Sequence, residues 1–222
     1  GGDIPVTLRR SARARRMTLR VTRAGGEVVL TLPSRASLRD GQVFAESRAE
    51  WLRQVRAGMP ALQLVAPGAL LPVEGVPRRI TPAAIRRVEL TADALRVPET
   101  RPAGVVAEAW LKHLAQVRLI AACDRHAAAL GRPFRALTLR DTRSRWGSCT
   151  HDGRLMFSWR LAMAPPEVLD YVAAHEVAHL AHMDHSDRFW AATGRLMPDY
   201  AGHRAWLRNH GHELLAWRFR II

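Results

Sequence analysis

Residues 175–185 read HEVAHLAHMDH, and four of these eleven residues are histidine. The whole chain of 222 residues contains ten histidines, so this stretch is a cluster. His175 and His179 are four positions apart, and on a helix such side chains lie on one face with Cβ atoms roughly 5–6 Å apart. Two imidazoles placed in this way can bind one zinc ion, each with a nitrogen about 2.0–2.1 Å from the metal. The spacing therefore predicts a metal-binding helix.

Glu176 follows His175 directly, so its carboxylate reaches beside the ion rather than onto it. That position suits a base that takes a proton from zinc-bound water and later passes it to the leaving group. An H-E-x-x-H pattern also arises by chance, but here it falls on a predicted helix with a further histidine beyond the helix end. The pattern predicts a catalytic zinc site with Glu176 as the general base.

A hydrolytic zinc site needs a third protein ligand and an open fourth position. Four residues downstream could supply the ligand: His182, Asp184, His185 and Asp187. We expect His185, because a residue beyond the helix end approaches the metal from the direction that a tetrahedron requires. His182 is expected on the helix, near the metal but not bound to it. A structural site would contain cysteines, and we interpret Cys149 as a small buried residue.

The elements around this cluster mix helices and strands. Pro165-Pro166-Glu167 is typical of a helix start and predicts a helix over about 166–182 that carries the histidines. Alternating residues at 134–141 and 154–160 predict two strands joined as a hairpin through a turn at 151–153. Further helices are expected over about 103–130, 187–196 and 200–210.

The first hundred residues are expected to be β-rich with one helix. Residues 15–22 and 27–32 alternate apolar and polar, which predicts a hairpin with its turn at residues 23–26. A helix is predicted over 36–57. Short strands are expected at 76–81, 86–91 and 94–97. The sequence thus predicts a β-rich N-terminal part over residues 1–100 and a catalytic domain over residues 101–222.

The composition indicates the cellular compartment in which we expect the protein. No apolar run approaches the roughly 18 residues of a membrane span, and the first residues lack a signal pattern, so no membrane association is expected. The two cysteines, Cys123 and Cys149, lie far apart and indicate no disulfide framework. We expect a cytoplasmic protein. The pattern leaves the oligomeric state open.

The chain is strongly basic, with a formal net charge of +14 from 34 basic and 20 acidic residues. Lys112 is its only lysine, so arginine supplies nearly all the positive charge. A basic surface favours an anionic partner such as nucleic acid, phosphate or acidic peptide. Scattered arginines on a solvated surface are the alternative. The exception to the scatter is an N-terminal cluster: Arg9, Arg10, Arg13, Arg15 and Arg16.

Several segments together resemble one known family. They are RRMTLRV (15–21), DTRSRWGSC (141–149), FSWRL (157–161), PPEVLDYVAAHEVAHL (165–180), HSDRFW (185–190) and LMPDY (196–200). This pattern resembles the YgjP-like zincin metallohydrolases, which are related to the SprT-like and WLM metallopeptidases, over nearly the whole chain. The resemblance implies an α+β fold with a zincin-like core, in which the active-site helix lies under a small antiparallel or mixed sheet.

The resemblance also implies roles for particular residues. It assigns zinc binding to His175, His179 and His185, and the base role to Glu176. Arg145 and Trp146, in the RWGSC segment, are candidate substrate-binding residues, because an edge strand over the active-site helix can pair with an extended substrate. The alternative is that Trp146 packs on a helix and Arg145 forms an ion pair.

These expectations lead to one main function and two alternatives. The main one is a zinc-dependent metallopeptidase acting on peptides or unfolded proteins. The first alternative is a nucleoside triphosphate pyrophosphohydrolase using the same metal, because arginines suit phosphates. Against it, the sequence has no Gly-rich phosphate loop. The second alternative is a nucleic-acid-associated protease docked by the N-terminal arginine cluster. The arginines near the predicted site are Arg140, Arg143, Arg145, Arg154 and Arg160.

Overall fold

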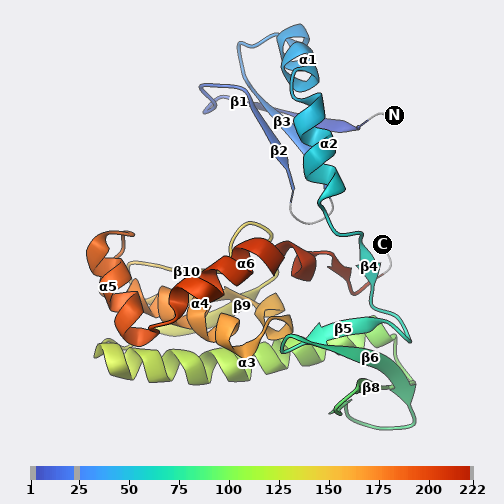
Figure 1. Ribbon diagram of the computed structural model, residues 1–222, viewed down its shortest axis with the longest axis vertical. Coiled ribbons are helices and arrows are strands. Elements are labelled where there is room, and N and C mark those ends of the chain that lie inside the picture. Colours follow the sequence, from blue (N-terminus) through green and yellow to red (C-terminus); the bar gives the residue numbers. More distant parts are fainter. Residues whose placement is uncertain (1–3, 23–25, 221–222) are drawn as a thin grey trace. The chain divides into compact units, whose positions relative to one another are not determined.

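The computed structural model describes residues 4–22 and 26–220. The chain divides into two compact units, Gly1–Leu62 and Gln63–Ile222, and both contain helices and strands (Figure 1). This confirms the α+β class. The predicted boundary at residue 100 lies inside the second unit, because the strands before it are bonded to the catalytic part. For example, the N–H of Glu74 donates to the carbonyl of Ala162 at 2.9 Å.

The N-terminal unit contains a three-stranded sheet and two helices. Its strands are β1 (Val6–Ser11), β2 (Thr18–Val21) and β3 (Val28–Pro33), in the order β1-β3-β2. The predicted hairpin is confirmed, since β2 pairs antiparallel with β3, while β1 pairs parallel with β3. Residues 23–25 of the predicted turn lie outside the described residues.

The single helix predicted over 36–57 is wrong, because the chain forms α1 (Leu38–Glu46) and α2 (Ala49–Ala57). The break falls at Ser47 and Arg48. The Ser47 hydroxyl donates to the carbonyl of Phe44 at 2.8 Å, and Arg48 has φ −108° and ψ 8°, outside the helical region. Both helices cover one face of the sheet, where Val28, Leu30 and Leu32 of β3 are buried.

The second unit begins with a mixed sheet of four strands, in the order β5-β6-β8-β7. The strands are β5 (Leu70–Val73), β6 (Val76–Ala83), β7 (Glu89–Leu90) and β8 (Ala94–Pro98). The three short strands predicted for this segment are therefore confirmed. A separate parallel pair joins β4 (Gln63–Leu64) to β12 (Trp217–Arg218), so the start and the end of this unit are hydrogen-bonded together.

Helix α3 (Ala103–Leu130) matches the predicted helix over 103–130. It ends where Gly131 adopts a left-handed conformation with φ 69°, which glycine tolerates without steric cost. One side of the helix is buried through Leu111, Leu119 and Cys123. In the unit's core this helix contacts α4 (Pro166–Ala178) and the 3₁₀ helix η1 (Trp159–Met163) (Figure 1).

A second mixed sheet lies beside α4, with strands in the order β10-β11-β9. Its strands are β9 (Ala136–Arg140), β10 (Gly147–Cys149) and β11 (Arg154–Ser158). The predicted hairpin between 134–141 and 154–160 is wrong, because β9 pairs with β11 in parallel. The turn at 151–153 instead joins β11 to β10, which residue alternation did not reveal because β10 is only three residues long.

The last helices follow the prediction with shifted ends. Helix α5 (Asp187–Leu196) has the predicted bounds, and α6 (Tyr200–Leu215) extends five residues beyond the predicted end. Helix α4 ends at Ala178 rather than near 182. It contacts both α5 and α6 as well as α3. Among the described residues, no helix is both long and apolar enough to cross a membrane.

A partly buried polar group ties α3 to α4. Oδ1 of Asp170 lies 2.8 Å from Nε2 of His126 and 2.8 Å from Nη2 of Arg125. Burial by itself raises the pKa of Asp170, but the hydrogen bond and charge of His126 and the charge of Arg125 outweigh it and hold the pKa below its usual value. Arg125 is mostly exposed, so His126, which is buried, contributes most of this stabilisation.

Asp170→Asn should therefore lower the free energy of unfolding by about 1–3 kcal/mol at pH 7. Because the pKa of Asp170 is lower in the folded chain, its contribution is complete above about pH 4 and is lost as the pH falls further. The difference in the free energy of unfolding between wild type and variant should shrink below that pH. Urea unfolding followed by tryptophan fluorescence measures it, with exposed Asp124→Asn as the control; equal losses in both variants would contradict this role.

Candidate metal centre

Three histidines from one short segment converge at the end of α4. His175 lies on the last full turn of the helix, His179 occupies its C-cap, and His185 lies in the connection to α5. Their ligand nitrogens all lie within 4.8 Å of one another. This group contains the three residues that the sequence predicted as ligands. The other candidates, His182, Asp184 and Asp187, are not part of it.

The separation of two ring nitrogens tests whether this group fits a metal ion. Nε2 of His175 and Nε2 of His185 are 3.2 Å apart. Two nitrogens bound to one tetrahedral zinc at about 2.1 Å are about 3.4 Å apart, which follows from the tetrahedral angle. The two rings therefore already have nearly the separation of zinc ligands. The donor set, three imidazoles with no thiolate, is that of a site with an open coordination position.

A backbone carbonyl orients the second histidine. Nδ1 of His179 lies 2.9 Å from the carbonyl oxygen of His182, and because a carbonyl only accepts, Nδ1 must carry the proton. Nε2 of His179 is then left with a free lone pair for the metal. The prediction that His182 lies on the helix is wrong, since α4 ends before it. His182 contributes its backbone rather than its side chain.

Aromatic rings of α5 pack against the imidazoles. Phe189, which is fully buried, stacks on His179 with ring centroids 4.4 Å apart. Trp190 stacks on His185 at 5.8 Å. This packing limits rotation of the rings and keeps water from one side of the site. The predicted helix over 187–196 located both residues, but nothing in the sequence assigned them to the metal centre.

The surroundings keep His175 and His179 neutral, as metal ligands must be. Burial, together with charge repulsion from His179, His185 and Arg204, lowers the pKa of His175 to about 3. Burial also lowers the pKa of His179. Both rings therefore offer a lone pair at neutral pH without having to lose a proton first.

Glu176 lies in the same region with only 5% of its surface exposed. Burial raises the pKa of its carboxyl to about 8, and the positive charge of Arg145 opposes that shift. A carboxyl group with a pKa near the working pH can both accept and donate a proton. A buried titratable group thus lies on the helix that carries His175, one position beyond it, as the H-E-x-x-H pattern predicted.

The comparison with known proteins shows the family of this chain. The family described as YgjP-like, metallopeptidase domain, matches residues 15–210. This chain belongs to the YgjP-like metallopeptidase family. No curated protein matches it. Among solved structures, the crystal structure of the metallopeptidase zymogen abylysin of Pyrococcus abyssi is similar to it, with 17% sequence identity and a TM-score of 0.37, over 40% of this chain and 93% of that one.

In this YgjP-like protein the RWGSC segment lies against both α4 and α6. Trp146 is half-buried and packs on α6, where a Cβ on Gly211 would come within 2.9 Å of its ring. Arg145 is exposed, and none of the ion pairs between described residues includes it. The packing alternative for Trp146 is thus supported, whereas the ion pair considered for Arg145 is not found among the described residues. Substrate binding by either residue stays a prediction.

Sequence reasoning also missed Arg204 of α6, which lies near the metal centre of this YgjP-like protein. Its guanidinium carbon lies 4.6 Å from the ring centroid of Trp190, and Trp190 lies 5.7 Å from His175. Tyr200, one turn earlier on α6, stacks on the same tryptophan at 5.4 Å. The i, i+4 spacing of Tyr200 and Arg204 was visible in the sequence. Only the fold brings that helix face to the metal centre.

Cys149, at the end of β10, does not join the metal centre. Burial, together with the negative charges of Glu176 and Asp152, raises the pKa of its thiol to about 11. The group is therefore a neutral thiol at physiological pH, whereas a metal ligand or nucleophile would be a thiolate. Cys149 was interpreted as a small buried residue, but it is only half-buried in the structure.

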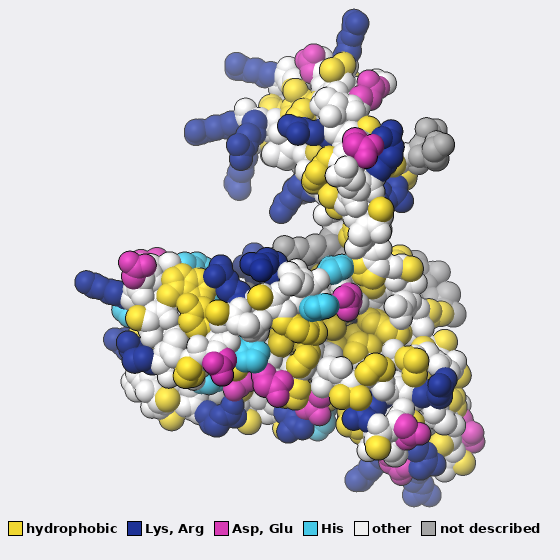
Figure 2. Space-filling view, viewed as in Figure 1, with side chains coloured by type: hydrophobic (Ala, Val, Ile, Leu, Met, Phe, Trp, Pro, Cys, Tyr) yellow, Lys and Arg dark blue, Asp and Glu magenta, His cyan; other side chains and the backbone are white. Residues whose placement is uncertain are grey.

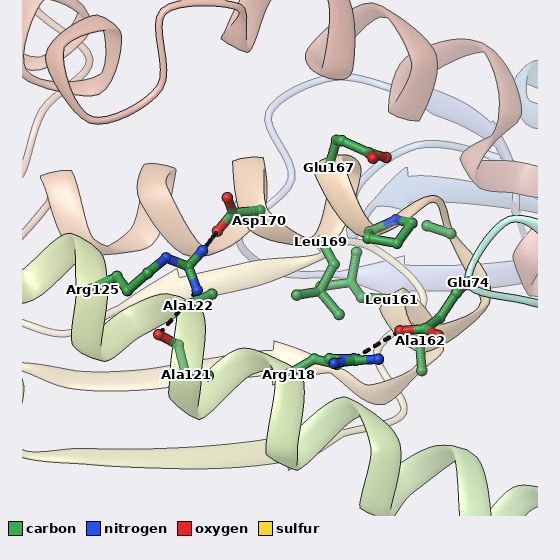
Figure 3. A pocket seen from close by; sticks show the side chains of 12 residues that line it. Glu74, Arg118, Ala121, Ala122, Arg125, Leu161, Ala162, Glu167, Leu169 and Asp170 are labelled. Atoms are coloured by element: carbon green, nitrogen blue, oxygen red, sulfur yellow. Dashed lines mark hydrogen bonds and ion pairs between the residues drawn. The ribbon is translucent and has the colours of Figure 1, made fainter.

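A cavity of about 420 Å³ lies elsewhere, between α3, η1 and the first turn of α4 (Figure 3). Four of the five charged groups that line it form ion pairs, Arg118 with Glu74 at 2.7 Å and Arg125 with Asp170 at 2.8 Å, and the fifth is Glu167. The cavity adjoins the start of α4, whereas the histidines lie at the end of that helix. The paired charges join α3 to its neighbours. The candidate active site is therefore the metal centre and not this cavity.

Gly147 of β10 approaches Glu176 so closely that a side chain does not fit. A Cβ at this position would lie 2.5 Å from Oε1 and 2.7 Å from Cδ of Glu176. Gly147→Ala should displace the carboxylate and reduce turnover by at least about tenfold, because small displacements of a catalytic group are costly. Zinc content should not change. Gly202→Ala, where a Cβ meets nothing within 4 Å, is the matched control; unchanged turnover in Gly147→Ala would contradict the prediction.

Proposed function

We propose that this protein is a zinc-dependent metallopeptidase that hydrolyses peptide bonds in extended or unfolded polypeptides. The observation that carries the proposal is the convergence of His175, His179 and His185 beside the buried carboxyl of Glu176. Membership of a metallopeptidase family supports it. The position of β10 at the edge of its sheet, next to Glu176, supports the choice of a peptide substrate.

The chemistry follows from these groups. A zinc ion held by the three histidines would polarise the scissile carbonyl and acidify a water molecule. Glu176 would accept the proton from that water and then donate it to the nitrogen of the leaving amine. Its raised pKa suits both steps near neutral pH. Arg204 would add positive charge near His175, where negative charge develops on the substrate oxygen.

The edge of β10 is suited to bind a peptide backbone. Within the described part of the chain, strand β10 pairs only with β11, and Trp146 and Thr150 at its two ends make backbone hydrogen bonds to residues of the β11 segment. In an antiparallel pair, alternate residues turn their N–H and C=O groups away from the partner strand. Gly147 and Cys149 therefore offer their backbone groups to an added strand. Because Gly147 adjoins Glu176, such a strand would pass beside the base.

The contacts of the arginines favour a peptide over a nucleotide. Of the arginines expected to bind phosphate, Arg160 is buried and donates to Asp141 and to the carbonyls of Leu214 and Trp217. Arg154 donates to Asp152 at 2.8 Å. These two side chains serve the fold and are not free for a triphosphate. Arg140, Arg143 and Arg145 are exposed and form no ion pair with another described residue, and of these three only the charge of Arg145 acts on Glu176. One exposed arginine near the base fits the carbonyl of a peptide.

A hydrolysis panel tests this function. Zinc-loaded protein is incubated with unfolded, reduced polypeptides and, separately, with nucleoside triphosphates. We expect new amino termini that disappear on chelation and return when zinc is added back, with no release of phosphate or pyrophosphate. Release of phosphate or pyrophosphate without new termini would reject the peptidase and support a nucleotide hydrolase at the same metal. Absence of both activities would also contradict the proposal.

A further inference from the structure

The N-terminal unit carries much more charge than its size predicts. Its 62 residues contain 12 arginines and 5 acidic residues, a net charge of +7, which is half of the +14 of all 222 residues. Figure 2 shows arginine side chains, in dark blue, projecting from this unit into solvent. Between its described residues one ion pair is found, Arg53 with Glu50 on α2. Nearly all of this charge is therefore available to a partner.

The strand register separates the unit's sheet into a covered face and an open one. Buried Leu30 faces the helices, and its partners Leu8 on β1 and Leu19 on β2 share that face. Because side chains alternate along a strand, the residues between them lie on the opposite face. We call this the open sheet face; it consists of Thr7, Arg9, Ser11, Thr18, Arg20, Val29, Thr31 and Pro33.

The open sheet face combines arginines with hydroxyl groups. Arg9 and Arg20 lie on its two outer strands, with Thr31 of β3 opposite Arg9. Their Cα atoms are about 12 Å apart by the usual strand spacing, so they can contact different phosphates. The β1–β2 connection adds three exposed arginines: Arg13, Arg15 and Arg16. The acid Glu27 adjoins one end, where its carboxylate accepts a hydrogen bond from Thr7 at 3.0 Å.

Arg10 does not belong to this surface. It pairs with Leu32 on the covered face, and its guanidinium donates to the carbonyls of Ser34 and Ala36 at 2.9 and 3.0 Å. The sequence grouped Arg10 with its neighbours, but the structure uses it to hold the segment before α1. The open sheet face therefore includes Arg9 but not Arg10, although the two are neighbours in the arginine cluster of the sequence.

We propose that the open sheet face binds the phosphate backbone of double-stranded nucleic acid. Arginine forks and Ser/Thr hydroxyls are the side chains that most often contact phosphate oxygens. Single-stranded nucleic acid is bound mainly by stacking on aromatic rings, and the sequence has no Phe, Tyr or Trp before Phe44. The side chains of the open sheet face can therefore contact the phosphate backbone of a duplex. The binding is independent of the hydrolytic site in the second unit.

The test measures how the binding of the full chain to a 20-base-pair DNA duplex depends on salt. Wild type should bind, with an affinity that falls steeply between 50 and 200 mM salt. Arg9→Gln with Arg20→Gln should weaken binding and lower the slope of log K against log salt by about 2, since each lost phosphate contact removes about 0.9. The matched control, Arg39→Gln with Arg56→Gln, removes equal charge from the helix side and should keep the wild-type slope.

Three results would overturn the proposal. They are no binding by wild type, an equal loss in both double variants, and equally tight binding of polyglutamate, which would make this a surface for acidic proteins. Circular dichroism checks that each variant is folded. Thr31→Asp gives an independent test, because it places a negative charge in the centre of the open sheet face without removing an arginine, and it should also weaken binding.

Discussion

Glu176→Gln should lower the turnover of peptide substrates by about 10²–10⁴-fold, the range that a positioned general base contributes. Glutamine has the shape of glutamate and fills the same buried space beside Gly147. It cannot accept a proton at neutral pH, so the loss is chemical rather than structural. The zinc content should stay at the wild-type level, because Glu176 is not one of the three convergent histidines.

The measurement combines kcat on an unfolded polypeptide with metal analysis of the same sample. Glu167→Gln, an exposed change on the first turn of the same helix, is the control and should leave turnover unchanged. If Glu176→Gln retained turnover within about threefold of wild type, Glu176 would have no part in the reaction. If the variant lost its metal, the residue would instead support the metal centre.

His185→Ala should cause the largest loss of metal affinity, at least about 100-fold. Changes to groups that only orient the ligands already cost 10–100-fold, and loss of a ligand removes more. His185 is exposed and lies outside the helices, so its removal should leave the fold largely intact. Competition with a chromophoric zinc chelator measures the affinity.

His182→Ala is the matched control, because His182 contributes its carbonyl, which alanine keeps, to Nδ1 of His179. It should bind zinc nearly as tightly as wild type. If His185→Ala retained its zinc fully, the third ligand would be another residue. If His182→Ala also lost its zinc, that ligand would be the side chain of His182. The two variants together distinguish these cases.

The convergence of the three histidines was predictable from the sequence, because they lie within eleven residues of one helix end. Local spacing determines where His175, Glu176 and His179 point once a helix forms. His185 followed from tetrahedral geometry. Arg204 and Phe189 were missed because they reach the site through packing between helices, which residue spacing within one segment does not encode.

Strand partners were harder to predict than strands. Alternation located the segments of β9 and β11, but it says nothing of which strands are neighbours, and the parallel pairing of these two was missed. The same limit applied to the N-terminal arginines. Arg9 and Arg10 lie on opposite faces of the sheet because they are neighbours in β1, a strand that the sequence analysis did not predict. The split of residues 36–57 into two helices depended on one serine hydroxyl.

The close approach of Gly147 to Glu176 also bears on how related proteins diverge. Any side chain at position 147 competes for the space of the carboxylate, so this glycine is needed only where the acid at position 176 is in use. Relatives that keep the acid should keep glycine there. Relatives that have lost the acid are free to place larger residues at position 147, so this pair of positions would mark lineages that retain the fold after giving up catalysis.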